Sequence, residues 1–317
     1  DRAAGRHIRL VANLPGTRHC RKILVPLSGI PLPEDKGHAK GNMIREFTEV
    51  YQALTGVLAA GEEAGLEIIP RLHPPAITAE GVVNRCRNDG FDGVICIESF
   101  PAGLPQAMER AGIPLVIANH ESPEPACSSG MDFRQVGRFA GRTLIEAGHH
   151  RIGFFSGPRN SAIYREMFAG FKGALAEDDL EVHPENFAHL EYGWGLGHWE
   201  NTVKAMLRMR NRPTAIFVCR DRRAAAVFAA AAAVGLRIPE DLSVLGYDNL
   251  TWPEGKIHGL TTIEQPAVNI GRAAVFLVQQ YFKTGIAPAS VRLPPGPLVR
   301  RTSLGPPPSR VAAGLAE

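Results

Sequence analysis

Long apolar runs are missing from this 317-residue sequence, although 44% of its residues are hydrophobic. A membrane-spanning helix needs roughly 18 to 20 consecutive apolar residues, so we expect a soluble globular protein with no membrane partner. The start, residues 1–6, also lacks an initiator methionine and the apolar core of a signal peptide. The chain therefore looks like a piece of a longer protein.

Cysteine and metal-ligand patterns are equally sparse. Five cysteines are scattered without CxxC spacing, which argues against a disulfide framework or a zinc site and favours a reducing cytoplasm. His149 and His150 adjoin on an expected turn after Gly148, where neighbouring side chains point apart, and no carboxylate stands at helical spacing from them. We expect neither a metal nor a cofactor.

An excess of one charge is also absent. The formal net charge of +3 is too small to indicate that the whole chain binds nucleic acid. Only residues 1–21 are clearly basic. This leader is either a solvated linker or a segment that contacts phosphates.

What the sequence does contain is a regular alternation of strand-like and helix-like segments, typical of parallel sheets with helices on both faces. The expected strands are residues 23–27, 66–72, 93–97, 115–118, 152–156, 187–190, 215–218, 243–247, 261–263 and 298–301. The expected helices are residues 47–58, 104–111, 136–147, 164–176, 197–209, 222–234 and 268–282. Two consecutive α/β modules are the simplest account.

The last helix and strand follow the second module. If they complete the sheets of both modules, the chain crosses between domains more than once and forms a multi-stranded hinge. Hinged modules of this kind bind ligands by closing. The expected division is residues 22–131 with 264–293, then residues 132–263 with 294–305, followed by a flexible tail at residues 306–317.

Polar residues or turns follow most of the expected strands. Ligands of open parallel sheets bind outside the carboxyl ends of the strands. For Asp221, N-capping of the next helix is the stronger interpretation. No helix is expected directly after Asp248, so this aspartate has no helix to cap, and we expect its side chain to bind a polar group. The strand ends are Ser28, Glu98 to Phe100, Asn119, Gly157-Pro158, Arg220-Asp221 and Asp248-Asn249.

Six sequence blocks, in order, resemble the effector-binding part of the LacI/GalR family of bacterial transcription regulators. The resemblance covers roughly residues 22–304. The blocks are AGHHRIGFFSGP (147–158), AIYREMFAGFKGAL (162–175), AIFVCRDRRAAAV (215–227), LSVLGYDNL (242–250), LTTIEQP (260–266) and PLVRRTSL (297–304).

This resemblance implies a type I periplasmic binding protein-like fold: two Rossmann-like or flavodoxin-like α/β subdomains, three crossover strands and a ligand in the cleft. It implies a sensor that binds a sugar, sugar acid or sugar phosphate and acts on operator DNA through a domain outside this chain, either a helix-turn-helix or a GntR-type winged helix. A homodimer is expected because operator half-sites mirror a two-fold axis. Residues 268–282 and 91–108 are the candidate pairing surfaces.

The resemblance also suggests roles for individual residues. Arg165 matches an arginine that commonly binds the effector, and a guanidinium suits hydroxyls or a carboxylate. Asp248 matches the family's ligand-contacting aspartate, whose carboxylate can accept two hydroxyls, with Arg165 or Arg220 stabilising its charge. Trp194 aligns with an aromatic residue that often stacks on a sugar, although a buried structural role explains it nearly as well.

Some positions depart from the family pattern. Arg220 stands where the family often has asparagine, so it either pairs with Asp248, which we favour, or binds an anionic ligand. Asn119 offers an amide where an aspartate sometimes stands. Phe47 and Tyr51 lie near the aromatic wall of the family's cleft, but packing along one helix face explains both equally well.

Two rival functions remain. Cys219, Asp248 and His258 follow the chain order of a hydrolase triad. A nucleophile elbow needs small residues two positions either side of the nucleophile, but Phe217 and Asp221 stand there, so we do not expect an enzyme. The serious alternative is the periplasmic solute-binding protein of a sugar importer, which would share the fold and the cleft.

Overall fold

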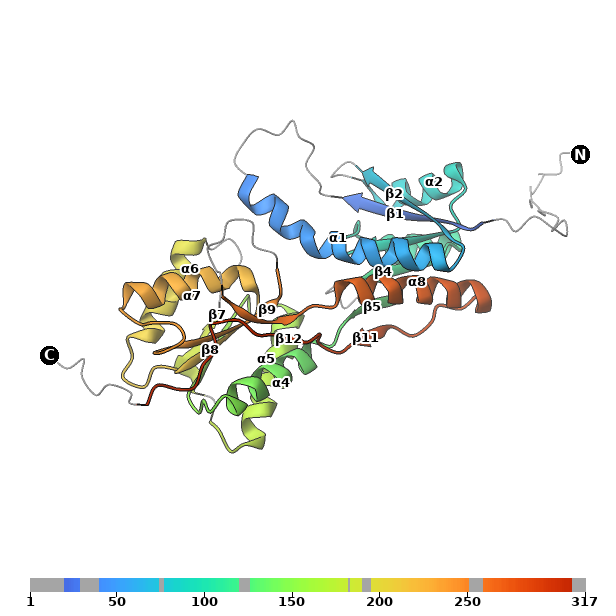
Figure 1. The fold of residues 1–317 in the computed structure, drawn as a ribbon. Coiled ribbons are helices and arrows are strands. Elements are labelled where there is room, and N and C mark those ends of the chain that lie inside the picture. The colour runs from blue at the N-terminus through green and yellow to red at the C-terminus, as the bar shows by residue number, and fades with distance from the viewer. Residues whose placement is uncertain are drawn as a thin grey trace, which may run out of the picture.

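Two six-stranded sheets, each flanked by helices, form two lobes placed end to end (Figure 1). The computed structural model describes residues 20–28, 40–73, 77–119, 126–181, 183–189, 195–250 and 259–309. The expected α/β fold with two parallel sheets is confirmed, and the single antiparallel pair within the described ranges joins β10 to β12. No described helix is both long and apolar enough to cross a bilayer.

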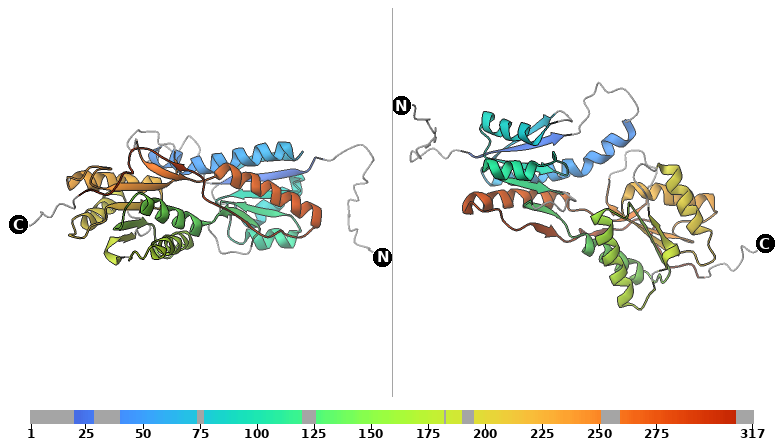
Figure 2. Two further views of the ribbon diagram at one scale, coloured as in Figure 1. Left: turned by 60° about the horizontal axis from the view of Figure 1, so that its bottom comes forward. Right: turned by 180° about the vertical axis from the view of Figure 1, so that it is seen from behind.

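The first sheet has the strand order β11-β5-β4-β3-β1-β2. Alternate side chains of β1 point to opposite faces, so Ile23 and Val25 join the core under α1 and α8, whereas Leu24 joins the core under α2 and α3. Figure 2 shows α1 and α8 side by side on one face. The elements are β1 (Lys22–Ser28), α1 (Lys40–Glu63), β2 (Glu67–His73), α2 (Ala79–Asp89), β3 (Gly93–Ile97), α3 (Leu104–Ala111), β4 (Leu115–Ala118), β5 (Ser128–Met131), α8 (Ala267–Thr284) and β11 (Val291–Leu293).

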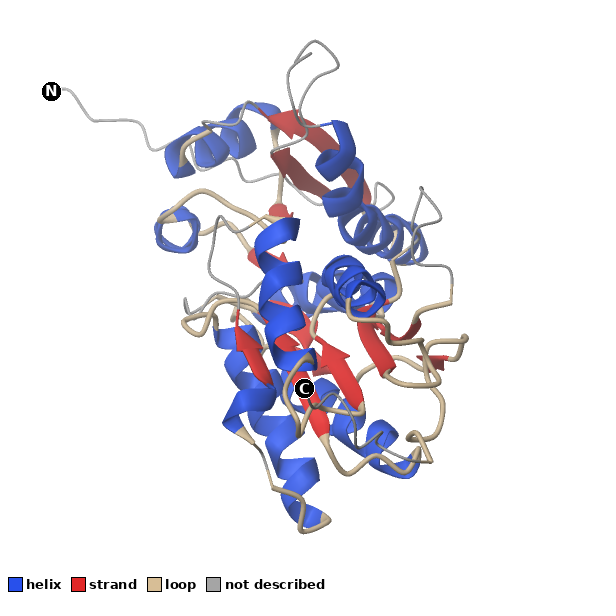
Figure 3. Cartoon of the chain, turned by 90° about the vertical axis from the view of Figure 1, so that its left-hand side faces the viewer, coloured by secondary structure: helices blue, strands red, loops and turns tan. Residues whose placement is uncertain are grey.

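The second sheet has the order β12-β10-β9-β8-β6-β7. Helices α4 and α5 cover one face and α6 and α7 the other, so helices flank this sheet on both sides (Figure 3). The elements are α4 (Phe133–Glu146), β6 (Ile152–Ser156), α5 (Ala162–Glu177), the short 3-10 helix η1 (Pro184–Asn186), β7 (Phe187–His189), α6 (Leu196–Leu207), β8 (Ala215–Val218), α7 (Asp221–Ala233), β9 (Ser243–Asp248), β10 (Thr261–Glu264) and β12 (Leu298–Val299).

The chain passes between the lobes at three places: after β5, after β10, and between β11 and β12. One apolar core cluster contains buried residues of both lobes, including Met131 beside the first crossing and Ile263 beside the second. The junction is therefore packed, and its crossings lie next to buried side chains rather than on an isolated linker.

Helices α4 and α5 approach each other through two glycines. A Cβ at Gly137 would overlap the carbonyl of Met167, and one at Gly170 would overlap the carbonyl of Arg134. Because both positions lack a side chain, the two backbones can pack directly against each other. This contact sets the position of α5 against α4. The first turn of α5 lies shortly after the carboxyl end of β6.

Candidate functional site

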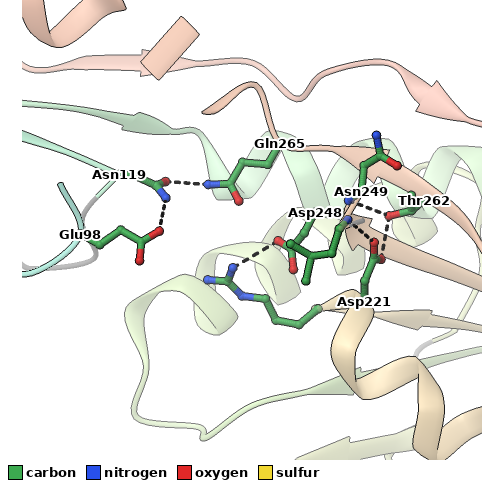
Figure 4. Close-up of polar contacts among 9 residues, drawn as sticks. Glu98, Asn119, Asp221, Asp248, Asn249, Thr262 and Gln265 are labelled. Carbon is green, nitrogen blue, oxygen red and sulfur yellow. Dashed lines mark hydrogen bonds and ion pairs between the residues drawn. The ribbon is translucent and has the colours of Figure 1, made fainter. Parts of the chain in front are cut away.

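Carboxyl ends of strands from the two sheets meet in a polar network near the hinge (Figure 4). Glu98 and Asn119 follow β3 and β4 of the first sheet, and Gln265 follows β10 of the second. Asn119 donates from Nδ2 to Glu98 Oε1 over 2.8 Å, and Gln265 donates from Nε2 to Asn119 Oδ1 over 2.6 Å. These bonds connect one lobe to the other.

The backbone at these strand ends is unusual. Glu98 and Asn119 have φ values of 62° and 55°, and Asp248 and Asn249 have values of 125° and 55°. Residues with side chains seldom adopt positive φ, and such conformations are concentrated at functional sites. All four residues at these strand ends share this rare backbone conformation.

Arg220 and Asp248 form an ion pair at the centre of the second lobe's strand ends. Arg220 Nη1 lies 3.2 Å from Asp248 Oδ1, with side-chain exposures of 16% and 1%. Of the two roles expected for Arg220, the structure shows this pairing. Arg220, the N-cap residue of α7, therefore compensates the charge of the aspartate that ends the apolar strand β9.

Asp221 lies behind this pair and is buried. Its two carboxylate oxygens accept from the Thr262 hydroxyl over 2.7 Å and from the Leu250 N–H over 3.1 Å. The expectation that it N-caps α7 is wrong, because Arg220 occupies the N-cap and Asp221 is the first helical residue. Burial raises the pKa of Asp221 to about 6, against the lowering effect of these hydrogen bonds.

Asn249 continues the network on the hinge side. Its Nδ2 donates to Glu264 Oε2 over 3.1 Å, and its Oδ1 accepts from Arg301 Nη2 over 2.8 Å. Sequence reasoning assigned no role to Glu264, Gln265 or Arg301. In the sequence, the one indication of a role for these residues was their position in LTTIEQP and PLVRRTSL, the two family-like blocks that follow Asp248 along the chain.

Arg165 lies elsewhere than expected. It is exposed in the first turn of α5, donates from Nη1 to the Asn160 carbonyl over 2.8 Å, and makes no described contact with Asp248. It lines a groove of about 720 Å³ between α5 and β7, together with Phe168, Phe187 and His189. Arg220, not Arg165, therefore supplies the positive charge next to Asp248.

Five other residues named in the sequence analysis stand as follows. Phe100 is half-buried and packs against the core under α2 and α3. Ser28 ends β1 and Phe47 lies in α1, but their side chains, like the whole of Trp194, are outside the described residues. Tyr51 is exposed on α1.

Neither the enzyme nor the metal interpretation gains support from the described part of the chain. Burial raises the pKa of the Cys219 thiol far above its usual range, which opposes formation of a nucleophilic thiolate. His258, the third member of the possible triad, lies outside the described residues. No described group of three or more metal-ligating side chains could hold an ion.

Residues 142–304 match the model of a periplasmic binding protein-like domain. The chain belongs to this family. It is 32% identical over 191 residues to the HTH-type transcriptional repressor PurR of Aliivibrio salmonicida, covering 60% of this chain and 57% of that protein. It is 34% identical over 150 residues to the ribose operon repressor of Haemophilus influenzae, covering 46% and 44%.

A solved complex of the transcriptional regulator CelR with cellobiose has a similar fold, with a TM-score of 0.69 and 23% identity over 90% of this chain and 85% of that one. Together these matches confirm the resemblance to the effector-binding region of LacI/GalR regulators. The chain spans only about half the length of the curated relatives, which are transcription regulators rather than enzymes.

Proposed function

We propose that this chain is the effector-sensing domain of a cytoplasmic bacterial transcription regulator, and that a sugar or sugar derivative binds between its lobes at the strand-end network. The supporting observation is Gln265. This residue is 4% exposed and its Oε1 has no hydrogen-bond partner in the described part of the chain, while its Nε2 is bonded to Asn119. A ligand hydroxyl would satisfy this buried acceptor.

The neighbouring groups suit a polyhydroxy ligand. A carboxylate accepts hydroxyl donors, and an amide both donates and accepts, so Asp248, Asn119 and Gln265 offer complementary partners from both lobes. A ligand that contacts both lobes favours the conformation in which they are close, by its differential affinity for that conformation. The change would reach operator DNA through a domain outside this chain.

A homodimer is part of this proposal. Large apolar side chains are exposed on the neighbouring helices α1 and α8, namely Tyr51, Leu58, Val268 and Phe276. By contrast, the main apolar residues of segment 91–108 are buried in the first lobe's core. We therefore favour α8, with α1, as the pairing surface.

Sedimentation velocity tests the pairing surface. Phe276, which is 53% exposed, becomes charged in Phe276→Asp and should shift the protein from dimer to monomer. Leu72→Asp, at a side chain of 56% exposure on β2, is the matched control and should leave the dimer intact. A dimer that survives Phe276→Asp unchanged would refute pairing through α8.

Calorimetry against a panel of neutral sugars, sugar acids and sugar phosphates tests the binding function. Asp248→Asn keeps the shape but removes the charge, and should weaken binding by about tenfold or more, because a hydrogen bond to a charged group is worth roughly 1.5–3 kcal/mol. The control is Asp179→Asn, an exposed aspartate with φ of 54° that does not belong to the network. Equal affinities for both variants would refute the site.

The alternative is the solute-binding protein of an importer. The relatives named above are repressors, which favours a regulator. The gene upstream of residue 1 decides between the two: a DNA-binding domain supports the regulator, and a signal peptide supports the importer protein.

A further inference from the structure

Three helices of the second lobe begin at one edge of its sheet. Helices α5, α6 and α7 follow β6, β7 and β8, which are neighbours in the order β8-β6-β7. None of the three has a side-chain hydrogen bond at its N-cap; the N-cap residues are Ser161, Gly195 and Arg220. The first backbone N–H groups of each helix therefore leave partial positive charge at this edge.

Arg223 lies among these helix starts. It is in the first turn of α7 and is 5% exposed, yet its Nε and Nη1 have no hydrogen-bond partner within the described ranges. None of the described acidic side chains forms an ion pair with it. Because burying an unpaired cation is costly, this arrangement indicates a site whose anion is supplied from outside the chain.

Two aromatic rings lie next to this guanidinium. Its Cζ lies 4.8 Å from the ring centre of Tyr164 in α5 and 5.8 Å from that of Trp199 in α6. A cation–π contact does not use the N–H groups as hydrogen-bond donors to an oxygen, and arginine binds a carboxylate or phosphate through those groups in a bidentate manner.

The end of β6 leaves room for this arrangement only because residue 157 is glycine. A Cβ there would overlap the Tyr164 ring and would stand 2.8 Å from Arg223 Nη2. Two more buried donors lie on the same helix starts without a partner in the described segments: the Ser161 hydroxyl and the Trp199 Nε1–H. All of these groups donate hydrogen bonds, and none is an acid.

The nearby carboxylates do not neutralise Arg223. Asp248 faces Arg220, and the two oxygens of Asp221 accept from Thr262 and Leu250. Neither carboxylate therefore forms an ion pair with Arg223, which is left without an acidic partner among the described side chains.

We propose that Arg223 is the centre of an anion subsite, and that the effector is a polyhydroxy compound with one carboxylate or phosphate group. The inference rests on the proposed sensing function and narrows its ligand class. Hydroxyls bind the network around Asp248 and Gln265, and the anionic group binds Arg223 at the starts of α5, α6 and α7.

Thermal shift and calorimetry at constant ionic strength test this subsite with four probes: glucose, gluconate, glucose 6-phosphate and inorganic phosphate. The wild-type protein should bind at least one anionic probe more tightly than glucose. Arg223→Met should reduce that affinity by about tenfold to hundredfold, as expected for loss of a charged hydrogen-bonding partner. Comparing the affinities for gluconate and glucose 6-phosphate shows whether the subsite prefers a carboxylate or a phosphate.

Controls separate charge, geometry and folding. Arg210→Met removes an equal charge from an exposed position beyond α6 and should leave binding unchanged. Arg223→Lys keeps the charge without the planar fork and should lose part of the affinity. The ligand-free Arg223→Met protein should melt no lower than the wild type, because an unpaired buried cation has been removed.

Several outcomes would overturn the subsite. The first is that anionic probes stabilise Arg223→Met as much as the wild type, and the second is that they stabilise neither protein. The third is that Arg223→Met melts far lower than the wild type while Arg223→Lys binds anions with wild-type affinity. Binding of glucose that is sensitive to Asp248→Asn but not to Arg223→Met would remove the subsite while leaving the sensing function in place. Failure of every probe to bind would count against both.

Discussion

Gln265 donates a hydrogen bond from Nε2 to Asn119 Oδ1 over 2.6 Å, joining the end of β10 in one lobe to the end of β4 in the other. Asn119 in turn donates to Glu98. A single amide beside one of the three crossings thus connects the polar strand ends of both sheets. Any movement of the lobes must either preserve this bond or replace it with a bond to water or to a ligand.

Replacing Gln265 with methionine should weaken this connection at nearly constant volume. We expect Gln265→Met to lower the free energy of unfolding by about 1 kcal/mol, the typical net value of one hydrogen bond, as measured by urea denaturation. Gln279→Met, at a half-buried position on α8, is the control and should change stability by less. Equal stabilities of the two variants would show that the bond between the lobes contributes nothing.

Glycine at the α4–α5 crossing should be intolerant of even a methyl group. In Gly170→Ala the new Cβ would overlap the Arg134 carbonyl, and the helices would have to separate at a cost of roughly 1–3 kcal/mol or more. Gly173→Ala, one turn further along α5, meets no atom within 4 Å. It should stabilise the protein by about 0.5–1 kcal/mol through helix propensity.

Thermal or urea unfolding of both alanine variants measures this contrast. Their opposite signs provide an internal control, since the substitutions are chemically identical and lie on the same helix. Two variants with the same stability would mean that α4 and α5 can separate freely, which would contradict direct packing of their backbones.

Much of the fold could be predicted because buried parallel strands are continuous apolar runs. Residues 93–97, 115–118, 152–156 and 215–218 were expected as strands and are strands with those bounds. By contrast, α2 was missed because its sequence is mostly polar. Its helix depends on the Thr78 side chain at the N-cap and on Gly90 at the C-cap, and both signals are weak without an apolar stripe.

The site was harder to predict for a different reason. Asp248, Arg220 and Asn119 were chosen as strand ends, and strand ends of parallel sheets do converge. β5 was missed because Ser128 and Ser129 give no strand pattern; Ser129 is instead buried, with its hydroxyl donating to a carbonyl of α8. Whether Arg165 points toward Asp248 or into the groove beside β7 depends on how α5 is rotated against the sheet. The spacing of residues along the sequence does not determine that rotation.

Asp221 should make the stability of the protein depend on pH in an unusual direction. Burial raises its pKa to about 6 in the folded state, whereas an aspartate in an unfolded chain has a pKa of about 3.9. The folded state therefore holds the proton more tightly. The contribution of Asp221 is fully present below about pH 4 and is lost as the pH rises through about 6.

Asp221→Asn removes this titration and resembles the protonated acid, because the amide can accept from the Leu250 N–H and donate to the Thr262 hydroxyl oxygen. Between about pH 4 and pH 7.5, the unfolding free energy of the wild type should therefore fall by roughly 2–3 kcal/mol relative to the variant. Urea denaturation across this range measures the difference. Asp179→Asn, at an exposed site, should follow the wild-type profile. Parallel profiles for Asp221→Asn and the wild type would mean that Asp221 stays ionised throughout, and that its two hydrogen bonds outweigh the cost of burying its charge.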